Sequence, residues 1–468
     1  MGYVAHRHQS NGRHQARTRS ERHPQSREVP ALSASAQVEA PPQSNFTTSD
    51  KPTWELYSTC IHCGLCLQQC PTYRVLGLEA DSPRGRIYQI LQVDAGRLAI
   101  ADSFVGHIDR CLGCLGCQTA CPSGVPYGHI VERARAEIHA NYPRPFLERK
   151  LRDWFYGKLL RSNESLSSLA KLLRFYQRSG LQALARKSGV LKLLGLARLE
   201  ALQPKIDTHF SFEDFGREFP AEGEQRGRVA LLAGCIASVS FDDLNQATIR
   251  VLNRNGIAVL IPAKQGCCGA LHAHAGRLEE ARAQARQNID AMLDENVDAI
   301  VTNAAGCGGT LKEYGDLLKD DPAYADKATQ FVAKMRDINE YLAESGVVPP
   351  ATPLNVRVTY QDPCHLAHAQ KIRSAPRQLL KAIGAQILEM PNSDLCCGSA
   401  GVYNVVQNEL SMKILQAKMD DVSSVEADVI ATANVGCMLQ LRAGVAQRGL
   451  DRRVMHVIEL LDEAYGQN

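Results

Sequence analysis

Residues 60–71 read CIHCGLCLQQCP, and residues 111–122 read CLGCLGCQTACP. Each stretch holds four cysteines in the spacing C-x2-C-x2-C-x3-C, followed by a proline. The chain has 16 cysteines in 468 residues, and all of them fall in clusters. The first residues lack the apolar core of a signal peptide, so we expect a reducing, cytoplasmic location in which the thiols stay free. Their clustering predicts metal or redox chemistry rather than a disulfide scaffold.

The spacing of the eight early cysteines matches the run that holds [4Fe–4S] clusters in two-cluster ferredoxins. Three thiolates two residues apart can curl a loop around a cubane, and Gly64, Gly113 and Gly116 allow a close backbone approach. In two-cluster proteins the fourth cysteine of each run serves the other cluster. We therefore predict crossed ligand sets, with Cys60, Cys63, Cys66 and Cys121 on the first cluster and Cys111, Cys114, Cys117 and Cys70 on the second.

Structural zinc is the alternative for this region, because it also uses cysteines two residues apart. A third cysteine two residues further on, present in both runs, is surplus to a four-ligand zinc site. Between the runs, Ser82 and Pro83 suit a helix N-cap and first turn, and Ile87, Ile90 and Leu91 recur at helical spacing. We expect residues 46–142 to form a mostly α-helical two-cluster module.

Two arginines, Arg84 and Arg86, stand at the start of this helical pattern. A cationic side chain near a cluster raises its reduction potential. Both arginines could instead pair with surface acids, and the sequence leaves the two interpretations open.

Beyond residue 228 the chain repeats itself. Strand-like segments end at Cys235 and Cys364, and a Cys-Cys-Gly triplet begins 32 positions after each of these cysteines. A further strand-like segment leads to Cys307 or Cys437, and the copies are offset by 129 residues at the first three cysteines and 130 at the last. Helical patterns over 241–256, 276–295, 374–384 and 406–420 separate the strands. This alternation predicts two duplicated α/β domains, 228–350 and 351–468, with parallel sheets and cysteines in loops after strands.

Convergence of these loops would gather four thiols in each repeat. They are Cys235, Cys267, Cys268 and Cys307 in the first repeat and Cys364, Cys396, Cys397 and Cys437 in the second. Such thiols could hold a further cluster or zinc, or could be reduced cysteines packed at loop ends. His365, beside Cys364, could be a ligand, a proton carrier or a structural group, and the first repeat has Ile236 at that place. The sequence leaves these alternatives open.

Two further segments complete the organisation. Residues 1–45 are nearly free of large apolar side chains, so we expect a disordered extension. Residues 143–198 carry thirteen Lys or Arg against three acids, with leucines at helical spacing, and residues 203–227 are a polar linker. The basic helices are a candidate docking face for anionic lipid or an acidic partner, or a brace with solvated charges. A net charge of +3 argues against a nucleic-acid partner.

Over roughly residues 50–465 these features resemble the iron–sulfur subunit of glycolate oxidase. The resemblance rests on the two-cluster runs, the basic helical segment and the paired Cys-Cys-Gly domains. Six further segments support it, namely SPRGRIY at 82–88, CPSGV at 121–125, AGCG at 305–308, KEYG at 312–315, HAQK at 368–371 and CCGSAG at 396–401.

This resemblance implies a complex in which flavin subunits oxidise glycolate to glyoxylate. FAD is then expected on partner flavoprotein subunits only, because this chain has no G-x-G-x-x-G turn, phosphate loop or evident base for a hydroxy acid. The chain would be the electron-transfer component of this enzyme, without catalytic residues of its own. It would relay electrons one at a time towards a quinone or another membrane acceptor, with peripheral contact to the inner face of the cytoplasmic membrane as one option.

Related oxidoreductases have similar cysteine frameworks, so three alternatives remain. The chain could serve anaerobic glycerol-3-phosphate dehydrogenase, lactate oxidation, or a heterodisulfide-reductase-like thiol chemistry. The last family ends each Cys-Cys-Gly domain with C-x2-C, whereas Thr310 and Gln440 stand at those places here. This departure puts the carry-over of that family's clusters and disulfide chemistry in doubt.

Overall fold

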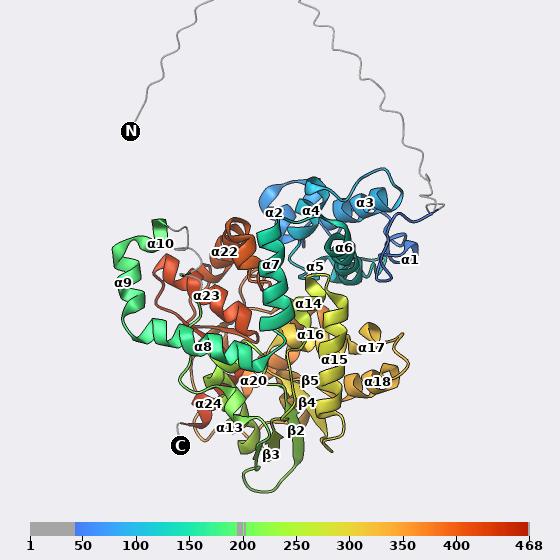
Figure 1. The fold of residues 1–468 in the computed structure, drawn as a ribbon. Helices are drawn as coiled ribbons and strands as arrows, with labels where there is room; N and C mark the ends of the chain where they lie inside the picture. Colours follow the sequence, from blue (N-terminus) through green and yellow to red (C-terminus); the bar gives the residue numbers. More distant parts are fainter. Residues whose placement is uncertain (1–42, 194–199, 201–202, 467–468) are drawn as a thin grey trace, which may run out of the picture. The chain divides into compact units, whose positions relative to one another are not determined.

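Short helices make up the N-terminal module, shown in blue to teal (Figure 1). The computed structural model describes residues 43–193, 200 and 203–466. In chain order the helices of this module are α1 (Trp54–Tyr57), α2 (Pro71–Leu76), the 3-10 helix η1 (Glu79–Asp81), α3 (Pro83–Asp94), α4 (Asp102–Asp109), α5 (Gly116–Thr119) and α6 (Tyr127–Asn141). No strand occurs in the described stretch 43–142, so the expected α-helical module is confirmed.

Helix α3 begins as its sequence predicts. The Ser82 hydroxyl accepts a hydrogen bond from the Gly85 N–H at 2.9 Å, and Pro83 occupies the first helical position. Ile90 of α3, Ile108 of α4 and Ile130 of α6 are each 0% exposed and pack in one cluster. Burial of each such side chain contributes about 1.5–3 kcal/mol, and together they close the module around the cysteine loops.

The chain ahead of α1 is tied to this module from its first described residues. Asn45 donates to the backbone oxygen of Asp94 at 2.8 Å, and the N–H groups of Thr47 and Thr48 donate to the buried Glu137 carboxylate at 3.0 and 2.8 Å. Of the expected disordered extension 1–45, only residues 43–45 are described, and these contact α3. The rest of that expectation lies outside the described residues.

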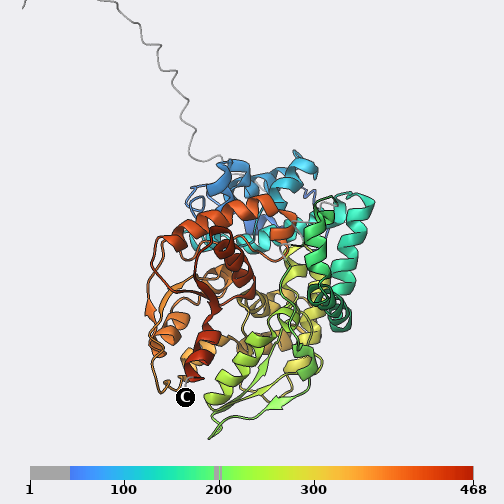
Figure 2. The ribbon, with the colours of Figure 1, turned by 90° about the vertical axis from the view of Figure 1, so that its left-hand side faces the viewer.

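The basic segment forms a series of helices that runs beside the first repeat (Figures 1 and 2). These are α7 (Phe146–Trp154), the π-helix η2 (Phe155–Leu159), α8 (Asn163–Arg178), α9 (Leu181–Ser188) and α10 (Val190–Leu193). Tyr156, Leu159 and Leu166 turn inward and share a buried cluster with Leu232 of the first repeat. None of the described helices combines the length and the apolar content needed to cross a bilayer.

The first repeat is built on a five-stranded sheet in the order β1-β3-β2-β4-β5. Its strands are β1 (Glu218–Phe219), β2 (Gly227–Leu231), β3 (Ile257–Leu260), β4 (Ala299–Thr302) and β5 (Met335–Asp337). All pairings are parallel except that of β1, an edge strand antiparallel to β3. Because β1 comes from the linker, the sheet of this domain reaches upstream of the boundary placed at residue 228.

The second repeat has the same order without the extra edge strand, β7-β6-β8-β9, and every pairing is parallel. Its strands are β6 (Arg357–Tyr360), β7 (Gln386–Ile387), β8 (Val429–Thr432) and β9 (Arg453–His456). This confirms two duplicated α/β domains with parallel sheets. The central strands pair as Val229↔Ala299 and Val358↔Val429, so in both repeats the strands that precede the first and last cysteines are neighbours.

Helices cover both faces of each sheet. In the first repeat they are the 3-10 helix η3 (Ser211–Asp214), α12 (Ala237–Ser240), α13 (Asp242–Arg254), α14 (Ala270–His274), α15 (Leu278–Met292), α16 (Ala305–Lys312), α17 (Tyr314–Leu317), α18 (Ala325–Lys334) and α19 (Ile338–Ser345). In the second they are the π-helix η4 (His365–Ala369), α20 (Ser374–Ala382), α21 (Tyr403–Val406), α22 (Asn408–Ser423), α23 (Val435–Arg448) and α24 (Val457–Tyr465). The four helical patterns read from the sequence correspond to α13, α15, α20 and α22.

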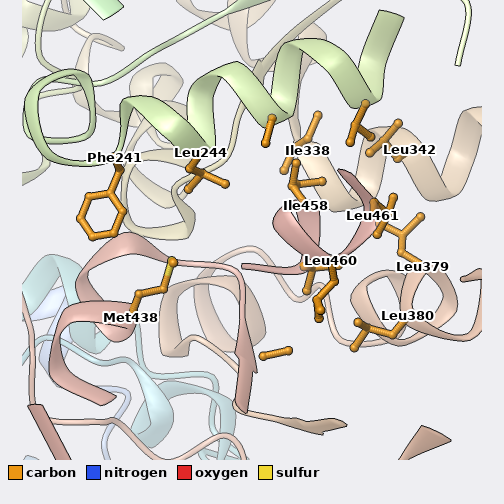
Figure 3. Packing of buried hydrophobic residues seen from close by; sticks show 14 of the residues in the cluster. Phe241, Leu244, Ile338, Leu342, Leu379, Leu380, Met438, Ile458, Leu460 and Leu461 are labelled. Atoms are coloured by element: carbon orange, nitrogen blue, oxygen red, sulfur yellow. The ribbon is translucent and has the colours of Figure 1, made fainter. Parts of the chain in front are cut away.

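The two repeats share one hydrophobic core (Figure 3). Leu244 of α13 and Leu342 of α19 lie in the same buried cluster as Leu379 of α20 and Leu461 of α24. An Arg250–Asp462 ion pair at 2.6 Å bridges the rim of this contact. Each repeat therefore covers an apolar face of the other, and the orientation of the two thiol sites relative to one another is set by this packing.

Candidate functional site

The two ferredoxin-type loops adopt the same backbone curl. Left-handed residues stand two and four positions after the first cysteine of each run, as His62 (φ 55°) and Gly64 (φ 84°) in one loop and Gly113 (φ 64°) and Leu115 (φ 62°) in the other. Gly116, for which the sequence suggested a similar role, is helical instead. A Cβ at Gly116 would lie 3.2 Å from the backbone oxygen of Gln69. The second loop therefore touches the end of the first run.

Electrostatic neighbours show how the eight thiols are grouped. Burial raises the pKa of Cys60, and among the thiols Cys121 adds most to this rise. Burial also raises the pKa of Cys117 well above normal, and Cys114, Cys111 and Cys70 raise it further. Thus Cys121 lies beside the first run, and Cys70 lies near the second run as well as near Cys66 of its own run.

Positive charge and hydrogen-bond donors face the second run. Burial by itself would raise the pKa of Cys111, but the charges of Arg86 and Arg135, the Gly113 N–H at 3.4 Å and the Tyr127 hydroxyl at 3.6 Å lower it below normal. Arg86 is 1% exposed and its Nη1 lies 4.0 Å from the Cys70 sulfur. These groups favour a thiolate, the form of cysteine that binds metal.

The sequence left two roles open for Arg84 and Arg86, a cation near a cluster or a partner of a surface acid, and the two arginines differ in this respect. Arg86 is enclosed by the module, where it donates to the His107 backbone oxygen at 2.7 Å and lies 3.5 Å from Asp81. Arg84 pairs with the half-exposed Glu79 at 2.8 Å, yet it also donates to the backbone oxygen of His62 at 2.9 Å. Arg86 thus faces the thiols, and Arg84 supports the first loop from the surface.

The donor set fits iron–sulfur clusters better than single ions. A tetrahedral zinc ion with bonds of about 2.3 Å needs sulfurs about 3.8 Å apart. Within the part of the chain that the structure describes, no three cysteine sulfurs lie within 4.8 Å of one another; the only such group of metal-binding side chains is His209, Asp214 and Asp242. Among the described residues, therefore, no set of three sulfurs is grouped as one zinc ion would require, and thiolate ligands suit iron–sulfur clusters.

In each repeat the four predicted thiols converge as a chain of neighbouring sulfurs. Cys235 and Cys267 are 3.6 Å apart, and contacts continue from Cys267 to Cys268 and from Cys268 to Cys307. The second repeat has the same sequence of contacts, from Cys364 through Cys396 and Cys397 to Cys437, with the last two sulfurs 3.4 Å apart. The convergence expected of the three loops is thus present in both repeats.

One detail differs from the expectation that all these cysteines lie in loops. Cys307 and Cys437 stand in the first turns of α16 and α23. Sequence reasoning missed this because Gly306 and Gly308 flank Cys307 and weaken the helical signal.

The second thiol chain also receives polar hydrogen bonds. The Gly398 N–H lies 3.5 Å from the Cys396 sulfur, and the Asn434 side-chain amide lies 3.4 Å from the Cys437 sulfur. Hydrogen bonds from Cys396 and Cys437 lower the pKa of Cys397 well below normal, although its burial acts in the opposite direction. Inert cysteines packed at loop ends would have no need of such donors.

The two thiol chains have different neighbours. Cys364 is the thiol that most raises the pKa of Cys114 after burial itself, and Cys114, Cys364 and Cys396 belong to one apolar cluster. His365 lies 3.0 Å from the backbone oxygen of Gly113, so its ring bridges the second repeat to the ferredoxin-type loop. The thiols of the first repeat lie instead in one apolar cluster with Tyr156 and Leu159 of the basic helices. The second thiol chain thus adjoins an N-terminal thiol through the Cys114–Cys364 neighbours.

Several residues of the site have no local sequence signal. Arg135 of α6 donates to the backbone oxygens of Cys111 at 2.5 Å and His274 at 2.8 Å, and so joins the N-terminal module to the first repeat. Gly276 makes this approach feasible, because a Cβ there would lie 2.3 Å from the Arg135 backbone. Residues this far apart in the chain meet only through the tertiary fold.

Comparison with known families gives matches in the N-terminal module, the basic segment and both repeats. Residues 57–125 match the 4Fe-4S dicluster domain, residues 147–203 match the linker region of the glycolate oxidase iron-sulfur subunit, and residues 229–312 and 358–442 each match the cysteine-rich domain.

Among curated proteins, the chain is 42% identical to the probable glycolate oxidase iron-sulfur subunit of Bacillus subtilis, over 87% of this chain and 94% of that one. It is 35% identical to the glycolate oxidase iron-sulfur subunit of Escherichia coli, over 86% and 93%. Lactate utilization protein A of Oceanobacillus iheyensis is 30% identical over 50% of this chain and 96% of its own.

Proposed function

The chain belongs to the family of glycolate oxidase iron–sulfur subunits, and from this premise we propose how its thiols and surfaces serve electron transfer. It is a subunit of an oxidoreductase complex with flavoprotein partners, and its dicluster domain carries two [4Fe–4S] clusters. Such clusters, when bound, take up and release one electron at a time.

Our ligand assignment is crossed, with Cys60, Cys63, Cys66 and Cys121 on one cluster and Cys111, Cys114, Cys117 and Cys70 on the other. The proximity of Cys121 to Cys60, and of Cys70 to Cys117, supports it. Arg86, the Gly113 N–H and the Tyr127 hydroxyl would stabilise the negative charge of the second set. The domain division that accompanies this assignment is 46–142, 143–227, 228–350 and 351–468.

Electrons would enter from the flavin of a partner subunit and leave towards a quinone or another membrane acceptor. The chain itself has no dinucleotide-binding motif, which is consistent with FAD on the partners only. The contact of Cys114 with Cys364 favours an exit through the second repeat. We propose that the four converging thiols of each repeat hold a further metal group.

Anaerobic addition of glycolate to the assembled complex should bleach the visible absorbance of this subunit, because electrons reach its clusters through the flavin. The purified chain should hold about eight irons with matching acid-labile sulfide if only the dicluster module is loaded, and more if the repeats are loaded too. Clusters that stay oxidised with glycolate but are reduced by dithionite would contradict the relay. A colourless protein with zinc and no sulfide would contradict the clusters themselves.

A thiol or disulfide reductase is the second candidate, since the repeats gather eight thiols, six of them buried. It predicts that Cys268→Ala and Cys397→Ala abolish turnover of a disulfide substrate while iron in the dicluster module is retained. Thr310 and Gln440, 3% and 1% exposed, occupy the places where that family has its last cysteines, which favours the electron relay.

We also propose that α7 docks the chain on an anionic bilayer. Leu147, Leu151 and Trp154 recur on one face of this helix and are 79%, 62% and 45% exposed. Arg149 and Lys150 lie beside them, each within 6 Å of the Phe146 ring. An exposed apolar stripe bordered by cations is typical of a helix that lies in the headgroup region of a membrane.

Vesicles that contain anionic lipid should therefore bind the chain more tightly than neutral vesicles, and salt should weaken the binding. The double variant Leu147→Asp with Leu151→Asp should lose at least about tenfold in vesicle affinity, because it removes the apolar side chains that would be buried in the bilayer. Val406→Asp, at a valine 63% exposed in the second repeat, is the matched control and should bind normally. If the α7 variant binds vesicles normally but no longer co-purifies with the flavoprotein subunits, α7 docks a protein instead.

A further inference from the structure

A group of half-buried ionisable side chains lies where the N-terminal module meets both repeats. Glu132 of α6, Thr310 of α16 and Glu313 line an open cavity of about 530 Å³. The same three residues line a chamber of about 10 Å³, which is about the size of one water molecule. Gly113 and Leu115 of the second ferredoxin-type loop form the far wall of that chamber. The group therefore connects solvent to the backbone of a cluster-binding loop.

One hydrogen bond and one ring contact join members of this group. His274 Nδ1 lies 2.7 Å from Glu132 Oε1, and the His274 ring packs edge-on against His365 with centroids 5.1 Å apart. The Thr310 hydroxyl is buried and has no hydrogen-bond partner among the described residues. A buried hydroxyl without a partner beside a water-sized chamber indicates a place for water.

Glu313 is the member of this group whose protonation state changes near neutral pH. Burial, together with the negative charges of Glu132 and Asp316, raises the pKa of Glu313 to about 7, with His274 acting in the opposite direction. The other ionisable groups around the cavity and chamber come from every neighbouring element. They are Asp50 from the segment before α1, His129, Arg133 and Arg135 of α6, Glu279, Arg282 and Arg286 of α15, Asp316 of α17, His365 of η4, and Lys319, Asp320 and Asp321.

We propose that Glu313 is a redox-linked proton acceptor, which takes up a proton from the cavity water when an electron reaches the second ferredoxin-type loop. The electron comes from the partner flavoprotein, the proton comes from water, and the carboxylate becomes a carboxylic acid. The inference rests on the proposed electron relay. Its physical cause is that negative charge added in a buried site raises the pKa of a nearby carboxyl group.

The test is a redox titration of the cluster-loaded chain at several pH values between about pH 6 and about pH 9, around the range in which a raised carboxyl pKa falls. Below about pH 7 Glu313 is protonated in both redox states, so the potential should not change with pH. Above that, the potential of one cluster should fall as pH rises, by up to tenfold in the reduction equilibrium per pH unit, or about 59 mV for one electron.

Glu313→Gln should remove this slope and Asp320→Asn, at an exposed residue of the same cavity, should keep it. The infrared difference spectrum between reduced and oxidised wild-type protein should gain one carboxylic-acid band, so the proposal can be tested even if the variant fails to assemble. A pH-independent potential, absence of that band, or a slope unchanged in Glu313→Gln would overturn it. Normal cluster reduction in those cases would leave the proposed relay intact.

Discussion

Cys70→Ala should remove one of the two clusters and leave the other in place. Iron should fall from about eight to about four per chain, and transfer of electrons from flavin to an external acceptor should be abolished. The reason is that Cys70 ends the first run but lies beside Cys114 and Cys117 of the second. Alanine has no sulfur to bind iron, so the second cluster would keep only three of its four cysteine ligands.

Pairs of substitutions test whether the ligands are crossed. Cys60→Ala with Cys121→Ala removes two ligands of the same proposed cluster, so about four irons should remain. Cys60→Ala with Cys70→Ala removes one ligand from each, so hardly any iron should remain. The reverse pattern, with iron retained in the second pair and lost in the first, would show that each run holds its own cluster.

Arg86→Met should destabilise the N-terminal module by about 3 kcal/mol, the lower end of the range for breaking a buried ion pair. Arg86 and Asp81 are 1% and 0% exposed, and without the guanidinium Asp81 keeps only His107 at 3.0 Å and Arg110 at 3.1 Å. The measurement is the urea midpoint at which cluster absorbance is lost. The potential of the second cluster should also fall, because a cation 4.0 Å from Cys70 is removed.

Arg84→Met is the matched control for this substitution. Arg84 and Glu79 form an exposed pair, with 30% and 49% of their side chains accessible, so its loss should cost less than about 1 kcal/mol. Equal urea midpoints for the two variants would contradict a structural role for the buried arginine. An unchanged potential in Arg86→Met would contradict its electrostatic role at the second thiol set.

Much of the fold follows from short-range patterns. The N-cap at Ser82, the helices α13, α15, α20 and α22, and the parallel strands of both repeats could be predicted because each depends on residues within about one turn or one strand. The edge strand β1 could not, since two residues give no periodic signal and its pairing depends on β3, some 40 residues downstream. The helical position of Cys307 could not be predicted either, because the flanking Gly306 and Gly308 weaken the local helical signal.

The sequence by itself determined which thiols belong together within each run and within each repeat, because C-x2-C spacing and an offset of 129 residues are properties of the chain alone. The fold decided which thiol groups are neighbours. His365 reaches Gly113 across 252 residues, and Glu132, His274 and Glu313 meet around one chamber, because apolar faces of the module and of both repeats pack together. Such packing depends on complementary surfaces of distant elements, and local spacing carries no record of it.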